Sequence, residues 1–310
     1  MAEIKKYSII TGLTHLKNIF QPTANQPRKS SNNIILNNMG HNHIEQGGER
    51  KTMNTDHEHQ HETDELWKKS EQSPFISGLR EGEKVADIME RLDYQRAFEK
   101  RSKVLGCSDG RCRGHRLGLP GDGILALQTD QEKCIRMLKD GGVDEVYSHA
   151  NCGAATLALR NTPPEHLPIG VKTAEDLAKY HAEGVARKLG AKCGHTEVCD
   201  MSGEVHNERA IYFDGTGMAN PEALPELPAG FIYSGPALGM SEERMQADIE
   251  TLASIALGDH GFGNRFTKEK PLYVVISAKD EEQLEALTEI AEKAAEQFHG
   301  RVAVDSFIAK

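Results

Sequence analysis

Long apolar runs are absent from this sequence, and so is a surplus of positive charge. No stretch approaches the roughly eighteen consecutive apolar residues that a membrane-spanning helix requires. The 310 residues carry 37 Lys and Arg against 47 Asp and Glu, a formal net charge of -10. Binding to a nucleic-acid backbone needs basic residues in excess. The composition therefore argues against a transmembrane protein and against a nucleic-acid partner.

Cysteine is also scarce, with six residues in the whole chain. A small secreted domain held by disulfides would contain many more. Three of the cysteines lie close in sequence to His or Asp, which favours reduced thiols used for chemistry or metal binding. We therefore expect a protein of the reducing cytoplasm.

The N-terminal segment, residues 1–66, is rich in Asn, Gln, Ser, His and charge and has no sustained apolar period. We predict a disordered tail. Five of its histidines (His41, His43, His57, His59 and His61) could bind a transition metal, but a mobile chain loses entropy when it closes around an ion, which favours a solvated tail. Purine-rich codons could encode residues 47–51 and resemble a ribosome-binding site, so we hypothesise that Met53 is the true start.

From residue 67 the pattern becomes that of a folded domain. Strands and helices alternate, which predicts an α/β fold with a largely parallel β-sheet flanked by helices. We divide this part into a main domain over residues 67–240 and a C-terminal strand-helix-strand extension over residues 241–310, packed on or beside it. The predicted strands cover residues 103–107, 124–127, 143–148, 210–213, 272–277 and 302–307; the predicted helices cover residues 85–100, 131–139, 174–189, 242–257 and 284–298, and one more begins near residue 152.

Two of the predicted strands end in residues that can hold a metal. Cys107 ends the first strand, and Asp109 and Arg111 follow at two-residue steps. His149 and Cys152 follow the third strand. Sites in open α/β sheets lie at such strand ends. Two thiolates and one imidazole suit Zn²⁺, and a fourth position left for water is typical of catalytic zinc.

These residues carry a resemblance to a known family. Residues 107–111 (C-S-D-G-R) and 149–153 (H-A-N-C-G) are similar to the C-x-D-x-R and H-x-x-C-G motifs of the β-class carbonic anhydrases. The flanking segments 117–124 and 211–217 also resemble the family, and the similarity spans about residues 80–235. The chain departs from the family at Ser148, where Gly is common, and at residues 126–130, where the family has Arg-Asn-Ala-Gly.

The resemblance implies a β-carbonic-anhydrase-like fold and reversible hydration of carbon dioxide to bicarbonate. Cys107, His149 and Cys152 would bind Zn²⁺ and lower the pKa of its water to about 7. Asp109 would accept a hydrogen bond from the resulting hydroxide, and Arg111 would hold Asp109 in a bidentate pair. In some members the Asp instead ligates zinc and switches the enzyme off. The family also implies a homodimer or higher oligomer, with the helix near residues 85–92 as the candidate arm.

Three other functions remain open at this stage. Cys107 and Arg113 form C-x₅-R, the spacing of cysteine-dependent phosphatases, although Asp109 would place a carboxylate inside that anion site. A non-catalytic zinc-stabilised binding module is a second alternative. A hydrolase of carbon disulfide or carbonyl sulfide is a third, because related folds act on these sulfur analogues.

A second group of possible metal ligands lies at Cys193, His195, Cys199 and His206. Its C-x-H-x₃-C spacing does not match a zinc finger, so an ordinary loop is the favoured interpretation and a structural zinc the alternative.

Overall fold

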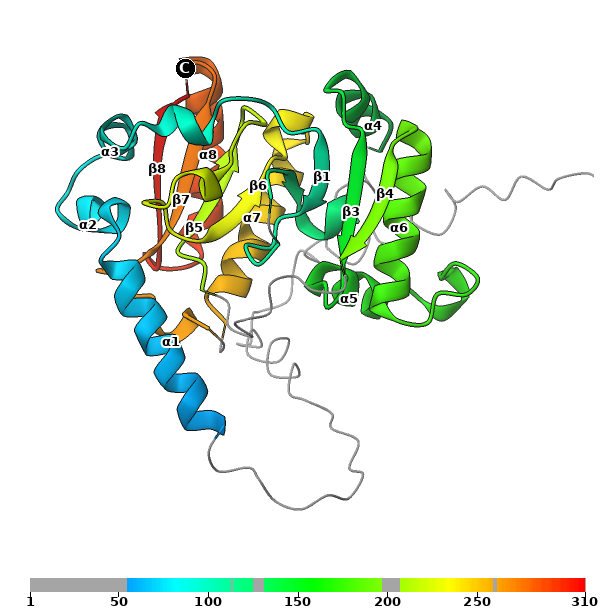
Figure 1. The fold of residues 1–310 in the computed structure, drawn as a ribbon, viewed down its shortest axis with the longest axis horizontal. Helices are drawn as coiled ribbons and strands as arrows, with labels where there is room; N and C mark the ends of the chain where they lie inside the picture. The colour runs from blue at the N-terminus through cyan, green and yellow to red at the C-terminus, as the bar shows by residue number, and fades with distance from the viewer. Residues whose placement is uncertain (1–54, 113, 125–130, 197–206, 259–260, 310) are drawn as a thin grey trace, which may run out of the picture.

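The computed structural model describes residues 55–112, 114–124, 131–196, 207–258 and 261–309. Within this part of the chain, eight strands form two four-stranded sheets, and helices cover both (Figure 1). All strand pairs inside each sheet are parallel. The predicted α/β class with parallel strands is thus confirmed, but the strands divide into two sheets. None of the helices described is both long and apolar enough to cross a bilayer.

The first sheet has the order β2-β1-β3-β4. Its strands are β1 (Val104–Cys107), β2 (Leu117–Leu119), β3 (Glu145–His149) and β4 (Lys192–Thr196). Three helices connect and cover them: α4 (Gln131–Asp140), α5 (Gly153–Asn161) and α6 (Ala174–Leu189). The central pair, β1 and β3, aligns Leu105 with Val146, and both side chains are fully buried. The parallel register places the carboxyl ends of β1 and β3 side by side.

The second sheet has the order β6-β5-β7-β8. It contains β5 (Ala210–Asp214), β6 (Gly230–Tyr233), β7 (Leu272–Ala278) and β8 (Val302–Ile308). Helices α7 (Glu242–Ala256) and α8 (Glu281–Glu296) lie on one face, while α2 (Pro74–Arg80) and α3 (Val85–Arg91) lie on the other. Because β7 pairs with β5 and β8 pairs with β7, the predicted boundary at residue 240 divides one sheet.

Both faces of the second sheet are buried, as the alternation along β5 shows. Ile211 and Phe213 belong to the core under α7 and α8, and Tyr212 belongs to the core under α2 and α3. Successive side chains of a strand point to opposite faces. A central parallel strand covered on both sides is therefore buried along its whole length. Every residue of β5 and β7 is buried, and Tyr273 is the most exposed of them at 8%.

The two sheets meet where β2 lies beside β6. The Ile232 amide donates to the Ser108 carbonyl over 3.0 Å, and the Ser234 amide donates to the Gly118 carbonyl over 2.8 Å. A Cβ atom at Gly118 would lie 2.0 Å from the carbonyl oxygen of Ile232, so only glycine permits this approach. One apolar core includes residues of both sheets, and the second sheet therefore supports the strand ends of the first.

Most predicted elements are present, but two were wrong in extent. The strand expected at residues 124–127 is replaced by β2, because a turn (η3, Pro120–Gly123) with left-handed φ at Gly121 and Asp122 ends the extended chain after Leu119. Residues 125–127 lie outside the described part. The helix expected to reach residue 100 ends at Arg91, since Asp93 has a φ of 54°.

The N-terminal segment also differs from the prediction. Residues 1–54 lie outside the described part, but α1 (Thr55–Glu71) is helical, which corrects the predicted end of the disordered tail at residue 66. Trp67 is 8% exposed and packs edge-on against Phe262 and Phe266, with ring centroids 5.0 and 5.5 Å away. The sequence pattern missed this helix because its apolar face contains few residues.

The buried Arg209 side chain connects α1 to the second sheet through polar and cation–π contacts. The Arg209 side chain is fully buried, and its guanidinium carbon lies 3.9 Å from the centre of the Trp67 ring. Its Nη1 donates to Glu71 Oε1 over 2.7 Å and to Ser70 Oγ over 3.1 Å. A buried charge is costly unless it is paired, so the ion pair and the cation–π contact together make this burial tolerable.

We expect Trp67→Ala to lower the free energy of unfolding by about 3–5 kcal/mol, because it removes a large buried side chain and its cation–π contact with Arg209. Urea unfolding followed by circular dichroism measures this loss. Trp67→Phe keeps an aromatic face and serves as the matched control with a smaller loss. A change below about 1 kcal/mol in Trp67→Ala would contradict the docking of α1.

Candidate metal centre

Three possible metal ligands meet at the carboxyl edge of the first sheet. Cys107 is the last residue of β1, His149 is the last residue of β3, and Cys152 caps the start of α5. Their ligand atoms all lie within 4.8 Å of one another. Within the part of the chain that the structure describes, this is the group of three or more such residues that could hold a metal ion. The expected convergence of Cys107, His149 and Cys152 is confirmed.

The donor set fits zinc. Tetrahedral zinc with bonds of about 2.0–2.3 Å separates its ligand atoms by roughly 3.3–3.8 Å, so small adjustments bring these three atoms to bonding distance. All three residues are buried, with exposures of 7%, 2% and 3% for Cys107, His149 and Cys152. Two sulfurs and one imidazole leave one tetrahedral position for a further ligand. The cluster is therefore able to hold a metal ion with an open site.

The two thiols do not titrate alike. The hydrogen bond with Cys152, followed by that with His149, holds the pKa of the Cys107 thiol well below its ordinary value. The hydrogen bond with Cys107 and burial raise the pKa of the Cys152 thiol well above it. In the metal-free protein the two thiols thus differ in acidity. Metal binding requires both as thiolates, so it releases protons.

His149 is oriented by its own backbone. Its Nδ1 lies 2.7 Å from the carbonyl oxygen of Ala150. A carbonyl oxygen can only accept, so Nδ1 donates its proton there and Nε2 is the nitrogen left for the cysteines or a metal. Such a hydrogen bond from the second nitrogen fixes the ring of a metal-binding histidine.

The turn after β2 closes the cluster from one side. The Gly121 amide donates to Cys107 Sγ over 3.3 Å. Gly121 has a φ of 58°, and a Cβ atom there would lie 2.9 Å from Ala154 Cβ and 3.4 Å from Cys152 Sγ. The position therefore requires glycine both for its backbone conformation and for the close approach to the thiols.

Asp109 and Arg111 form the expected pair beside the cluster. Arg111 Nε donates to Asp109 Oδ1 over 3.0 Å and Arg111 Nη2 donates to Asp109 Oδ2 over 2.7 Å. The Arg111 amide donates to Oδ1 as well, over 3.0 Å. Both side chains are largely buried, with side-chain exposures of 10% and 13%. The carboxylate is thus held by the guanidinium, and Asp109 is not part of the three-residue ligand group.

The second sheet packs closely against Gly110, between Asp109 and Arg111. A Cβ atom at Gly110 would lie 2.8 Å from both the Gly230 carbonyl oxygen and the Glu208 Cγ. Glu208 is itself 1% exposed. Any side chain at Gly110 would therefore displace the turn between Asp109 and Arg111. Sequence reasoning placed no weight on Glu208, since the contact joins residues almost a hundred positions apart.

His181 on α6 is another residue that sequence reasoning passed over. Its Nε2 lies 3.3 Å from the Asp122 carbonyl oxygen, in the same turn as Gly121. Burial lowers the pKa of His181 to about 4. The neutral imidazole therefore supports the turn that contacts Cys107. A lone histidine in an amphipathic helix gives no sequence signal that separates this role from ordinary packing.

The second predicted ligand group is only partly described. Cys199 and His206 lie outside the described residues. Cys193 is exposed on β4, whereas His195 turns to Ser148, whose Oγ lies 2.9 Å from His195 Nδ1. His195 Nε2 lies 3.4 Å from Glu175 Oε1. His195 thus has polar partners other than Cys193. Arg113, which the phosphatase alternative requires, also lies outside the described residues.

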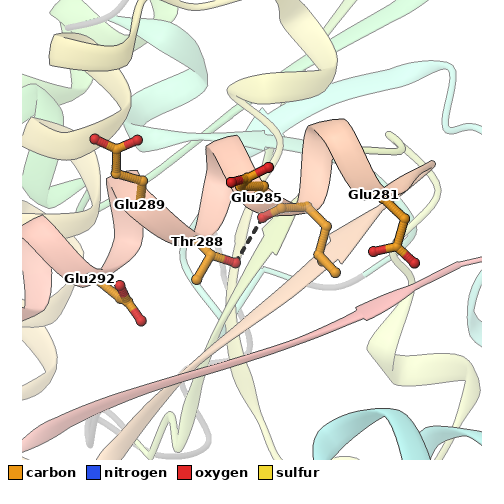
Figure 2. A pocket seen from close by; sticks show the side chains of 6 residues that line it. Glu281, Glu285, Thr288, Glu289 and Glu292 are labelled. Atoms are coloured by element: carbon orange, nitrogen blue, oxygen red, sulfur yellow. Dashed lines mark hydrogen bonds between the residues drawn. The ribbon is translucent and has the colours of Figure 1, made fainter.

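A row of carboxylates marks the outer face of α8, far along the chain from the cysteines. Glu281, Glu285, Glu289 and Glu292 line a shallow hollow there (Figure 2). The Thr288 hydroxyl in this row donates to the Leu284 carbonyl over 2.8 Å and so belongs to the helix. Exposed acidic groups of this kind are common on solvated helices, and we assign no site to them.

Comparison of the chain with models of protein families, with curated proteins and with solved structures gives no match.

His181 leads to a prediction about pH. Its folded pKa of about 4 lies below the ordinary 6.5, so the unfolded chain binds more protons between these values. The stability of the metal-free protein should therefore fall by about 3 kcal/mol more than that of His181→Gln as the pH drops from 7 to 4. Urea unfolding across this range tests it.

His166→Gln is the control, because it replaces an exposed histidine, and it should follow the parent protein. Parallel pH profiles for the parent and His181→Gln would show that His181 titrates normally.

Proposed function

We propose that this chain is a zinc-dependent enzyme of the β-carbonic-anhydrase type that catalyses the reversible hydration of carbon dioxide. One observation carries the proposal: a buried Cys107–His149–Cys152 cluster and a bidentate Asp109–Arg111 pair lie at the same edge of one parallel sheet. The cluster supplies ligands for the metal, and the pair supplies an oriented carboxylate next to it. The motif resemblance and this geometry support the same reaction.

The surroundings of the cluster favour a small, uncharged substrate. Cys107 and Cys152 belong to an apolar cluster with Ile124, Ala155 and Leu177. Carbon dioxide has no net charge and can enter such surroundings without the desolvation cost that a phosphate ester would pay. The apolar wall and the carboxylate of Asp109 therefore favour the hydratase over the phosphatase alternative.

A zinc ion held by the three ligands would supply the nucleophile near neutral pH, because it lowers the pKa of water to about 7. Asp109 accepts three hydrogen bonds from Arg111, which orient its carboxylate. A carboxylate held in this way would accept a hydrogen bond from the attacking water and set its direction. Arg111 keeps Asp109 oriented.

The resemblance also leads us to propose a homodimer or larger homo-oligomer, with residues 67–240 as the zinc domain. The cysteine content leads us to propose the cytoplasm. The sedimentation behaviour of the purified protein tests the oligomer.

The function is tested by measuring zinc content and stopped-flow hydration of carbon dioxide on one preparation. We expect about one zinc per chain and measurable turnover. Replacement of Cys152 by Ala should remove most of the zinc, because only three protein residues hold it. Zinc without turnover would select the non-catalytic module or, if carbonyl sulfide is hydrolysed, the sulfur analogue. Full zinc occupancy in Cys152→Ala would contradict the site.

The role of Asp109 is tested by Asp109→Asn, which keeps the shape of the side chain and removes its charge. Zinc should remain while turnover falls by about tenfold or more, because a preorganised polar group is lost. Asp140→Asn, at the exposed end of α4, is the matched control and should behave as the parent. Turnover equal to the parent in Asp109→Asn would reduce Asp109 to a turn residue.

A further inference from the structure

Arg116 donates hydrogen bonds to the backbone of the segment that carries Cys107 and Asp109. It lies one residue before β2, and only 4% of it is exposed. Its Nε donates to the Cys107 carbonyl and its Nη2 to the Asp109 carbonyl, each over 2.7 Å. Its Nη1 donates to the Gly114 carbonyl over 3.0 Å. One buried side chain therefore joins three carbonyls of the segment that carries both the ligand and the carboxylate.

The geometry of these bonds couples two functional residues. Nε and Nη2 form one edge of the planar guanidinium, and this edge meets the carbonyls of residues 107 and 109 together. By fixing these two carbonyls, Arg116 sets the direction of the Cys107 thiol and the Asp109 carboxylate relative to each other.

Gly106 and Glu222 accommodate the Arg116 side chain, one by leaving space and the other by its charge. A Cβ atom at Gly106 would lie 3.0 Å from Arg116 Cδ, so glycine leaves room for the arginine stem. Glu222, from a turn that follows β5 of the second sheet, accepts a hydrogen bond from the Gly114 amide over 3.2 Å. Its other oxygen lies 3.9 Å from Arg116 Nη1. The second sheet thus supplies the acidic partner of the buried cation.

We propose that Arg116 is a positioning residue of the metal centre, which holds Cys107 and Asp109 in their working arrangement, with Glu222 as its support. The proposal rests on the function proposed above, because it assumes that the Cys107 cluster holds a metal. Lysine cannot replace Arg116, since an ammonium group is a single point and cannot bridge two carbonyls in a fixed plane.

The test uses the full chain loaded with zinc and, separately, with Co²⁺, whose visible spectrum reports the geometry of its ligands. Arg116→Lys keeps the charge and removes the planar fork. We expect it to release zinc to a chelator about 10–100 times faster than the parent and to shift the Co²⁺ absorption bands. Arg136→Lys, on the exposed face of α4, is the matched control and should match the parent in both measurements.

Glu222→Gln is the second variant, because Glu222 is one-third exposed and its replacement should not prevent folding. We expect it to speed zinc release by about two- to fivefold, as the loss of a partly exposed charge predicts. If Arg116→Lys fails to fold, the rate of zinc release from Glu222→Gln tests the positioning role of Arg116 in its place.

The outcomes separate the two proposals. A parent protein that binds neither zinc nor Co²⁺ overturns the proposed function. A parent that binds both metals, together with an Arg116→Lys protein whose release rate and spectrum equal those of Arg136→Lys, overturns the positioning role of Arg116. Glu222→Gln with parental zinc release overturns the support role of Glu222.

Discussion

The parallel pairing of β1 with β3 is the constraint on which the candidate metal centre depends. It aligns Val104 with Glu145 and Leu105 with Val146, and so brings the strand ends Cys107 and His149 to one edge. A slip of one residue would turn every side chain of a strand to the opposite face. His149 would then leave the cysteines. The fully buried Leu105 and Val146 oppose such a slip, because it would remove their side chains from the positions in the core that they now fill.

The second sheet supports the edge of the first sheet that carries the candidate metal ligands. Main-chain bonds from Ile232 and Ser234 hold the ends of β1 and β2, and the Gly230 carbonyl presses against Gly110. The second sheet therefore contacts the segment that follows β1 at Ser108 and at Gly110. Preorganised groups stabilise a transition state because they do not need to reorganise during the reaction. The C-terminal half of the chain in this way supports the edge that carries the candidate metal site.

Local patterns predicted the elements that have strong periodicity, such as α6 and α8, and the three ligands, because strand ends and motif spacing are visible in sequence. Three features could not be predicted in this way. The short β2 has only three residues, and the turn after it depends on left-handed φ angles at Gly121 and Asp122. Arg116, an isolated basic residue in sequence, gains its role only from carbonyls brought near by the fold. The docking of α1 depends on Arg209, more than 130 residues away.

X-ray absorption at the zinc edge is the most direct test of the central claim, that Cys107, His149 and Cys152 hold zinc with one position left open. The protein would be loaded with one equivalent of zinc and its first coordination shell measured. The account predicts two sulfur ligands at about 2.3 Å and two nitrogen or oxygen ligands at about 2.0–2.1 Å. In His149→Ala, the signature of a coordinated imidazole should disappear. A shell without sulfur, or an imidazole signature unchanged in His149→Ala, would contradict it.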